Sequence, residues 1–520
     1  MSVKSQHRVE PTPAAERAHK RAWVAVTIIT IVGLMVWHLS TVVLYPYPHV
    51  DEAWFANRAM GYLTTGVPFG TMDAGVFDRY PQPWLIFPLI PTLLQALVLR
   101  VVGAVDLMAL RILSLIAGAA LLYSLYRIAS RVAGRWAGIA SVTLLGVSLP
   151  FLVASHYARH DILAAAAGWG AIAIFFVSRR RWTDVAAGAL VMVGVEMHPN
   201  AAIFGLTLAV LALFDHSDRV KRFLAICAGG LIGLIGFLAV HVLPNPDSYA
   251  AVNGIAFVDT HVPPVLSGSV DVIIDSFILK ARLLASGFPV VAGARWLLAI
   301  VVIAVWVGLL LSSKGEDRRL AQMAALLGIS FALMVRNTIF YYAILVAPVA
   351  PLLLGVGLVR FSGLRPGMNW RRTTVVISAL VFVALGFPVF QIVTTSPNNF
   401  DRASTEIASI LEPDDVVMGS QSYWFAAPEI DWRSWETLVY YRRVEPDASL
   451  LQAFRDLGPE VLVVDSHVRT FVTDEDWSMG SYPQALGLPG DQFDDLLASG
   501  RLVATVEDGS DEGIQIFRFP

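Results

Sequence analysis

The sequence predicts a polytopic α-helical membrane protein that carries a small α/β domain at its C-terminal end. Hydrophobic residues make up 56% of the 520 residues and charged residues only 15%, whereas soluble domains carry about 25% charged residues. Apolar runs near the length of a bilayer crossing recur along the chain, for example over residues 22–44, 223–243 and 296–311. Backbone groups in lipid must be hydrogen-bonded internally, so we expect these runs to be helices.

The charges divide the chain into two parts of opposite sign. Residues 401–520 hold 23 of the 41 acidic residues but only 8 of the 38 basic ones. This segment therefore has a formal charge of −15, and the preceding 400 residues have one of +12. We predict a cytoplasmic tail over residues 1–21, a transmembrane domain over 22–397 and a soluble α/β domain outside the membrane over 398–520.

Basic clusters determine the expected threading, because cytoplasmic loops collect Lys and Arg. The six clusters lie at 4–21, 127–135, 179–181, 219–222, 314–319 and 360–372. When all six are placed in the cytoplasm, the chain crosses the membrane about eleven times. The expected spans are 22–45, 108–127, 136–155, 161–178, 183–198, 200–214, 222–243, 294–311, 319–335, 338–358 and 373–395. The N-terminus is then cytoplasmic and the C-terminal domain extracytoplasmic, with the plasma membrane of a prokaryote as the expected location.

One further apolar stretch, 82–102, is long enough to span the membrane but contains three prolines. A crossing here would move the basic cluster at 127–135 to the outer side. We therefore expect a helix that lies at the outer surface, with the prolines near its start. The outer side then receives a long loop over 46–107, a turn over 156–160, a loop over 244–293, a turn at 336–337 and the C-terminal domain. Long loops are usually functional or linkers, so we expect the function on the outer face.

Two adjacent carboxylates, Asp51 and Glu52, follow the first span at the start of an expected short helix. Acidic residues favour a helix N-terminus through capping and the helix dipole, and this alone would explain the pair. The functional interpretation is a general base at the mouth of a membrane cavity, where partial burial makes a carboxylate a better proton acceptor.

The turn at 155–161 falls on the same face and contains Arg159, His160 and Asp161 in succession. A short loop needs polar residues in any case. Three ionisable groups in a row at the membrane surface are nevertheless costly unless they pair or bind something. These three residues are therefore candidates for substrate binding.

Two arginines on the outer face are candidates for binding an anion. Arg336 interrupts an apolar stretch shortly before Tyr341, and an interfacial arginine that reaches water would also explain it. Arg79, next to Tyr80, lies in the first outer loop. Two guanidinium groups match the oxygens of a phosphate.

Glu196 and His198 lie together at the outer end of the fifth expected span, and we interpret them as a buried, hydrogen-bonded pair. The single cysteine, Cys227, lies inside an apolar run, so disulfides and cysteine-rich metal sites are excluded. None of the candidate groups has metal-ligand spacing such as His-x-x-x-His on a helix.

Four short motifs together resemble the C-type (GT-C) membrane glycosyltransferases. They are Asp51-Glu52-Ala53 after the first span, Tyr62-Leu63-x-x-Gly66, Arg79-Tyr80-Pro81-x-Pro83 and Ala158-Arg159-His160-Asp161. The resemblance covers about residues 25–395 and is closest to the branch of the polyprenyl-phosphate-mannose protein mannosyltransferases and the aminoarabinose transferases. The chain departs from the family at Gln82, which separates two prolines that are usually adjacent, and at His160, where proline is common. These departures bear on the details of donor contact.

The resemblance implies a glycosyltransferase that moves a sugar from a polyprenyl-phosphate donor to an acceptor hydroxyl on the outer face, with inversion at the anomeric carbon. Asp51 would be the general base, and Glu52 would orient the acceptor or the base. Arg159 and Asp161 would shape the sugar pocket, and Arg79 and Arg336 would bind the donor phosphate. The remaining substrate-binding residues would be Tyr80, His160 and Tyr341.

The two arginines supply the positive charge that a phosphate leaving group needs, so no metal is required. A carboxylate-bound divalent cation is the open alternative. The expected partners are the lipid-linked donor, the bilayer and an acceptor that is a glycan, a lipid or a protein, with no nucleic acid. Aromatic residues between 423 and 441 are expected to pack in a core or at an interface. A platform on which an acceptor sugar stacks is the alternative interpretation.

The competing function class is a secondary transporter with an external accessory domain. Transporters place ionisable groups at the midplane, commonly on broken helices in repeated halves. Here the candidate residues lie at the outer ends of spans, and the sequence contains no evident repeat. A non-catalytic scaffold is the third class, and the charged outer turns argue against it.

Overall fold

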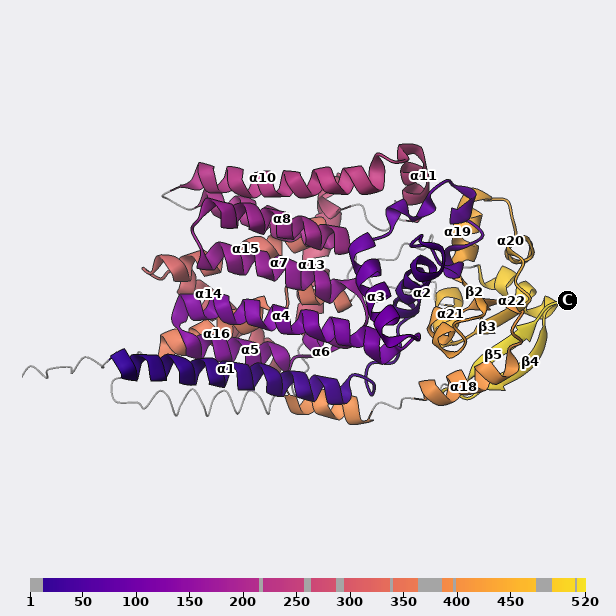
Figure 1. The fold of residues 1–520 in the computed structure, drawn as a ribbon, viewed down its shortest axis with the longest axis horizontal. Helices are drawn as coiled ribbons and strands as arrows, with labels where there is room; N and C mark the ends of the chain where they lie inside the picture. The colour runs from indigo at the N-terminus through magenta and orange to yellow at the C-terminus, as the bar shows by residue number, and fades with distance from the viewer. Residues whose placement is uncertain are drawn as a thin grey trace, which may run out of the picture.

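A computed structural model describes residues 13–214, 218–256, 263–286, 294–336, 340–362, 386–395, 399–473, 489–509 and 512–520. The molecule has two parts that meet end to end (Figure 1). One part is a bundle of long, roughly parallel helices, and the other is a C-terminal sheet with its own helices, at one end of that bundle. Two helices from the first outer loop, α2 (Val50–Thr65) and α3 (Leu89–Val102), lie between the parts.

The bundle is built from apolar helices. In chain order they are α1 (Pro13–Thr41), α4 (Leu107–Ala133), α5 (Arg135–Gly146), α6 (Leu149–His156), α7 (His160–Val177), α8 (Arg181–Met197), α9 (Ala202–Leu213), α10 (Arg219–Phe237), α14 (Ala294–Leu310), α15 (Gly315–Met334) and α16 (Val349–Ser362). Glycines let some backbones approach closely, as small residues do between helices in lipid. A Cβ atom on Gly229 of α10 would lie 1.9 Å from the carbonyl oxygen of Val185 in α8.

Several helices are long and apolar enough to cross a membrane. In the described residues these are Leu107–Ala133, His160–Val177, Arg219–Val242 and Phe340–Phe361. Helices α5 and α6 together make a fifth candidate, bent by 67° at the break between them. Pro150 at the start of α6 explains the break, because proline lacks the donor that a continuous helix would need. The protein is therefore an integral membrane protein with several spans, while the expected number of about eleven stays a prediction.

Three of the six remaining expected spans, 22–45, 200–214 and 294–311, coincide with shorter apolar helices, and 183–198 and 319–335 coincide with α8 and α15. Four shorter apolar helices cover Ala25–Thr41, Leu89–Val102, Pro199–Leu213 and Leu298–Leu310. The second of these is α3, where we expected a surface helix, and its described helical part begins after Pro88. Most of the last expected span, 373–395, lies outside the described residues.

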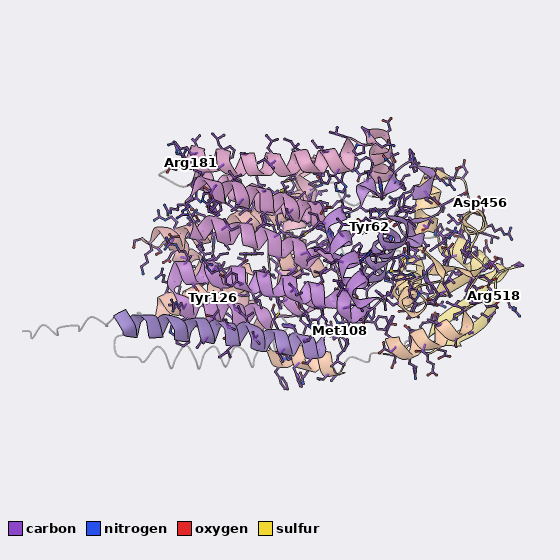
Figure 2. The ribbon with its side chains drawn as sticks, viewed as in Figure 1. Tyr62, Met108, Tyr126, Arg181, Asp456 and Arg518 are labelled. Atoms are coloured by element: carbon purple, nitrogen blue, oxygen red, sulfur yellow. The ribbon has the colours of Figure 1, made fainter. Side chains whose placement is uncertain are left out.

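The basic clusters of separate loops meet at the end of the bundle away from the sheet. The carboxylate of Glu316 in α15 forms an ion pair with the Arg131 guanidinium at 3.1 Å and lies 3.9 Å from that of Arg179. Its neighbour Asp317 pairs with Arg360 at 2.8 Å. Figure 2 shows Arg181 at this end, opposite Asp456 and Arg518. The structure thus groups these clusters at one end, as the threading requires, and the orientation in the membrane stays a prediction.

The C-terminal part is a mixed five-stranded sheet with the order β2-β1-β3-β5-β4. Its strands are β1 (Val416–Gly419), β2 (Asp431–Ser434), β3 (Val461–Val464), β4 (Arg501–Val506) and β5 (Ile514–Arg518). Its described helices include α18 (Phe400–Ile410), α19 (Glu436–Val444), α20 (Leu450–Leu457), α21 (Ser466–Thr473) and α22 (Gly490–Ser499). The β1, β2 and β3 strands run parallel, and β5 is antiparallel to β3 and β4.

The aromatic cluster between 423 and 441 is a core and not an exposed platform. Trp424 and Trp432 are fully buried, and Trp435 and Tyr423 are 1% exposed. These side chains share one apolar cluster with residues of the first outer loop, among them Trp54, so the cluster spans both parts of the molecule. Packing therefore explains these aromatic residues, as it does for most clusters of this kind.

Polar contacts join the sheet to the first outer loop. The Tyr47 and Tyr423 hydroxyls lie 2.7 Å apart, and Ser422 donates to the Pro48 carbonyl at 3.0 Å. The Thr71 hydroxyl donates to the carbonyl of Trp432, also at 3.0 Å. The outer loop is thus held between the bundle and the sheet.

Candidate active site

Helix α2 begins with a capping box that places both acidic candidates. His49 is the N-cap residue, and its ring accepts a hydrogen bond from the Asp51 backbone N–H at 3.1 Å. The His49 backbone N–H donates to the Glu52 carboxylate at 2.8 Å. Capping therefore fixes Asp51 and Glu52 in the first turn, and the consecutive side chains point in different directions.

Glu52 is fully buried, and its hydrogen-bonding capacity is used. Arg111 of α4 donates to both carboxylate oxygens, at 2.9 and 2.8 Å. The Ala158 backbone N–H donates to the same carboxylate at 2.7 Å, and His49 supplies the fourth bond. A carboxylate has about four acceptor sites. Glu52 therefore joins the first loop, α4 and the 156–160 turn, and it orients its neighbour Asp51.

Arg111 extends this junction into the chain that leaves α1. Its guanidinium donates to the carbonyls of Val42 at 2.7 Å and Pro46 at 3.2 Å. Arg111 was not among the residues predicted from the sequence. A charged residue inside an otherwise apolar run indicates a buried partner. Arg111 lies in such a run, so the sequence did contain this signal.

Asp51 is the accessible member of the acidic pair. Its side chain is 22% exposed, whereas that of Glu52 is 0% exposed. Its carboxylate forms an ion pair with Arg159 and lies 3.6 Å from the His49 ring. Burial, followed by the nearby positive charge of Arg159, holds the pKa of His49 well below its usual range. His49 is therefore neutral at physiological pH, which suits its acceptor role at the cap.

Arg159 lies between two carboxylates. Its Nε atom donates to Asp161 at 2.8 Å, and its Nη1 atom pairs with Asp51. The guanidinium lies over the Tyr341 ring, 3.6 Å from the ring centre. Because Arg159 is only 4% exposed, its planar group is held in one orientation by these three neighbours. The structure thus gathers Asp51, Arg159, Asp161 and Tyr341 into one cluster at the end of the bundle that faces the sheet.

His160 and His198 extend this cluster on the side of Asp161. The His160 ring is stacked on Phe55 of α2, with 3.8 Å between ring centres. The His198 ring lies 5.0 Å from that of Tyr342, and its Nε2 atom is 3.8 Å from Asp161.

The expected pairing of Glu196 with His198 is not what the described contacts show. Glu196 instead accepts from the backbone N–H groups of Leu89 and Ile90 and so caps the start of α3. It also lies 3.5 Å from His241. Each position along a helix turns the side-chain direction by about 100°. Glu196 and His198 are two positions apart, so their side chains point to nearly opposite sides.

Arg79, Tyr80 and Arg336 stand apart from this cluster in their described contacts. Arg79 donates to the Gly75 carbonyl, lies over the Tyr441 ring and is 3.7 Å from Glu445. Tyr80 packs partly buried against the core shared with the sheet. Arg336 accepts a hydrogen bond from Lys280 at its backbone carbonyl, at 3.1 Å. No described contact joins Arg79 to Arg336.

A metal centre is not evident in the described part of the chain. Within these residues, no group of three or more His, Cys, Asp or Glu side chains is placed to hold a metal ion. The charge of the cluster comes from one guanidinium and two carboxylates.

The chain is similar to one family model and to several solved structures. Residues 87–242 match the model of the dolichyl-phosphate-mannose-protein mannosyltransferase family. ArnT from Cupriavidus metallidurans bound to undecaprenyl phosphate has a similar fold, with a TM-score of 0.63 and 14% identity over 95% of this chain and 98% of that chain. The apo form of ArnT gives a TM-score of 0.57 at 15% identity, over 97% and 98% of the two chains.

An archaeal oligosaccharyltransferase is also similar in fold. The apo enzyme from Archaeoglobus fulgidus gives a TM-score of 0.52 at 12% identity, over 88% of this chain and 72% of that chain. No curated protein matches the chain in sequence. The family match includes α4, α7 and the Arg159–Asp161 turn, and the fold match extends over the bundle and the sheet. Residues 87–242 are thus similar to the dolichyl-phosphate-mannose-protein mannosyltransferase family, and the chain as a whole shares its fold with ArnT.

Proposed function

We propose that this protein transfers a sugar from a polyprenyl-phosphate donor to an acceptor hydroxyl at the outer face of the membrane, with Asp51 as the general base. The observation that carries the proposal is the division of work between the two adjacent carboxylates. Glu52 is buried and saturated with hydrogen bonds, whereas Asp51 is partly exposed and oriented by them. A base needs access to the proton that it removes.

The surroundings of Asp51 suit that role. Arg159 pairs with Asp51 and so holds its carboxylate in a fixed position. A hydroxyl that enters beside Asp51 would lose its proton to the carboxylate while its oxygen attacks the anomeric carbon. The bond from that carbon to the phosphate oxygen breaks, and polyprenyl phosphate leaves with the electron pair. Attack from the face opposite the leaving group inverts the anomeric configuration.

The donor class is supported by the comparisons. ArnT binds undecaprenyl phosphate, and the archaeal oligosaccharyltransferase AglB has been solved with dolichol-phosphate. A lipid donor is reached from within the bilayer, which is consistent with a site at the end of the helix bundle. Arg79 and Arg336 stand in the proposal as the residues that bind the phosphate, where their charge would offset the negative charge that grows on the leaving group. Arg79 keeps a side chain that is 38% exposed.

The location follows the threading of the chain. The basic clusters lie at one end of the bundle, and the candidate site and the sheet lie at the other. If the basic end faces the cytoplasm, the Asp51 site and residues 399–520 face outward.

The experiment compares cells that lack the gene with cells that carry the wild type, Asp51→Asn or Asp78→Asn. Asp78 is the matched control, because it is an exposed carboxylate of the same loop whose described hydrogen bond comes from the Gly75 backbone N–H. Mass spectrometry of glycans and lipids should show a sugar modification that is absent from cells without the gene. The modification should be equally abundant in cells with the wild type and in cells with Asp78→Asn. It should be absent with Asp51→Asn, while that purified variant still binds undecaprenyl phosphate. Modification at the wild-type level with Asp51→Asn would remove Asp51 from the base role.

A further inference from the structure

Polar atoms beside the Asp51–Arg159 pair are buried without a partner. Asp161 is 2% exposed, and its Oδ2 atom is bound by Arg159. Its Oδ1 atom has no hydrogen-bond partner among the described residues, and the Nε2 atom of His160 has none either. Buried polar groups are hydrogen-bonded in most native structures, so unpartnered atoms at a functional site call for an explanation.

The tautomer of His198 can be read from its contacts. The Asn200 backbone N–H donates to His198 Nδ1 at 3.2 Å. A backbone N–H can only donate, so Nδ1 is the unprotonated nitrogen and the ring proton is on Nε2. That N–H faces Asp161 Oδ1, but the two atoms are 3.8 Å apart. This separation is too long for a direct hydrogen bond.

A hydroxyl group matches this geometry. Its oxygen can lie about 2.8 Å from each of two atoms that are farther apart than a single hydrogen bond. It would accept from His198 Nε2–H and donate to Asp161 Oδ1, and only a group that both accepts and donates satisfies both atoms. Water commonly bridges polar groups that are more than 3.5 Å apart, and a ligand hydroxyl can take the place of such a water because it also donates and accepts.

We propose that His198 and Asp161 bind one hydroxyl group of the transferred sugar between them, and that this pair selects a neutral sugar over an amino sugar. The proposal rests on the function proposed above. An ammonium group would donate to Asp161 but could not accept from His198, so the His198 N–H would be left buried and unpaired. His160 is the residue before Asp161, and its ring is stacked on Phe55. Its unpartnered Nε2 atom would provide a second contact to the sugar ring.

Arg159 links this subsite to the proposed base. One guanidinium holds Asp51 with Nη1 and Asp161 with Nε. A sugar bound at Asp161 is therefore positioned by the same residue that orients Asp51. Selection of the sugar and placement of its anomeric carbon are then coupled.

The test measures binding of lipid probes to the full chain in nanodiscs. The probes are undecaprenyl phosphate alone and the same lipid carrying mannose, arabinose or 4-amino-4-deoxyarabinose. The wild type should bind at least one neutral-sugar lipid about tenfold or more tightly than the bare lipid. It should show no such preference for the amino-sugar lipid. His198→Leu should lose the preference without a change in affinity for the bare lipid, and His198→Gln, which keeps a donor, should regain part of it.

His241→Leu is the matched control. His241 is a buried histidine at the same end of the bundle, but it contacts the Leu85 carbonyl and Glu196 instead of Asp161. This variant should keep the preference for the neutral sugar. A wild type that prefers the amino-sugar lipid or shows no sugar preference, or a His198→Leu variant that keeps the preference, would overturn the inference. A wild type that does not bind undecaprenyl phosphate would instead contradict the proposed function.

Discussion

Glu52 and Arg111 form a two-point ion pair, with both guanidinium-to-carboxylate distances below 3 Å, although they are 59 positions apart in the chain. The pair ties the start of α2 to α4 and leaves Asp51 facing the accessible side. It is fully buried, so its contribution depends on both partners being present.

We expect removal of either partner to destabilise the outer end of the bundle. Arg111→Met leaves the Glu52 carboxylate buried without its counter-charge, which typically costs about 3–5 kcal/mol. Thermal unfolding in detergent should show a clear drop in midpoint, and protease should reach the 46–60 segment. Arg100→Met, an exposed arginine at the end of α3, is the control and should behave like the wild type. An equal midpoint for Arg111→Met would show that the pair is not a structural requirement.

Arg159 should resist conservative replacement. Arg159→Lys keeps the charge but offers a single ammonium in place of a planar group that binds two carboxylates and stacks on Tyr341. We expect sugar transfer to fall by about tenfold or more, with the folded protein retained. The transfer rate and the thermal midpoint are measured for each variant. Arg127→Lys, near the end of α4 that lies away from the sheet, is the control. A lysine variant with full activity would mean that charge alone suffices at this position.

His49 should make stability depend on pH. Its pKa in the folded protein is lowered by burial and then by Arg159, well below the ordinary value of 6.5. Below about pH 6.5 the unfolded chain takes up a proton that the folded chain does not, so this contribution to stability is full above that pH and is lost as the pH falls. His49→Asn keeps a capping acceptor but does not titrate. Its thermal midpoint should fall less than that of the wild type between about pH 7 and 5. Parallel curves for the two proteins would contradict this assignment.

Glu196 should hold the beginning of α3. Its carboxylate accepts from the Leu89 and Ile90 backbone N–H groups, which no residue within α3 can satisfy. Glu196→Ala should cost about 1 kcal/mol and increase hydrogen exchange in the first turn of α3. Glu316→Ala, at the other end of the bundle, should leave exchange in α3 unchanged. Unchanged exchange in the Glu196 variant would indicate that packing alone fixes this helix start.

The sequence predicted well those features that depend on local pattern. Apolar length located α4, α7 and α10, and the shift to an acidic, less apolar composition located the α/β part at the C-terminal end. The expected span 136–155 is instead broken between α5 and α6, where Pro150 was an overlooked local signal, and the 67° angle of the break depends on packing.

The candidate site shows the same division. Adjacency in the chain drew attention to Asp51 and to the Arg159–Asp161 turn, and the fold brings these residues into contact, while their roles stay predictions. The separation of Arg79 from Arg336 depends on where the outer loop meets the sheet, which no local pattern records. Arg111 and His198 act through partners 59 and 37 positions away, so their roles emerge only from tertiary structure.

The seam formed by Tyr47–Tyr423, Ser422–Pro48 and Thr71–Trp432 has a consequence for how such a chain can be divided. The apolar cluster at this contact contains side chains from both the 46–107 loop and the sheet, so separating the two would expose apolar side chains on each. A chimera that joins this bundle to the sheet of a distant relative would therefore need the 46–107 loop to be exchanged together with that sheet. Inheritance of the loop and the sheet as one unit is the expectation for natural recombinants as well.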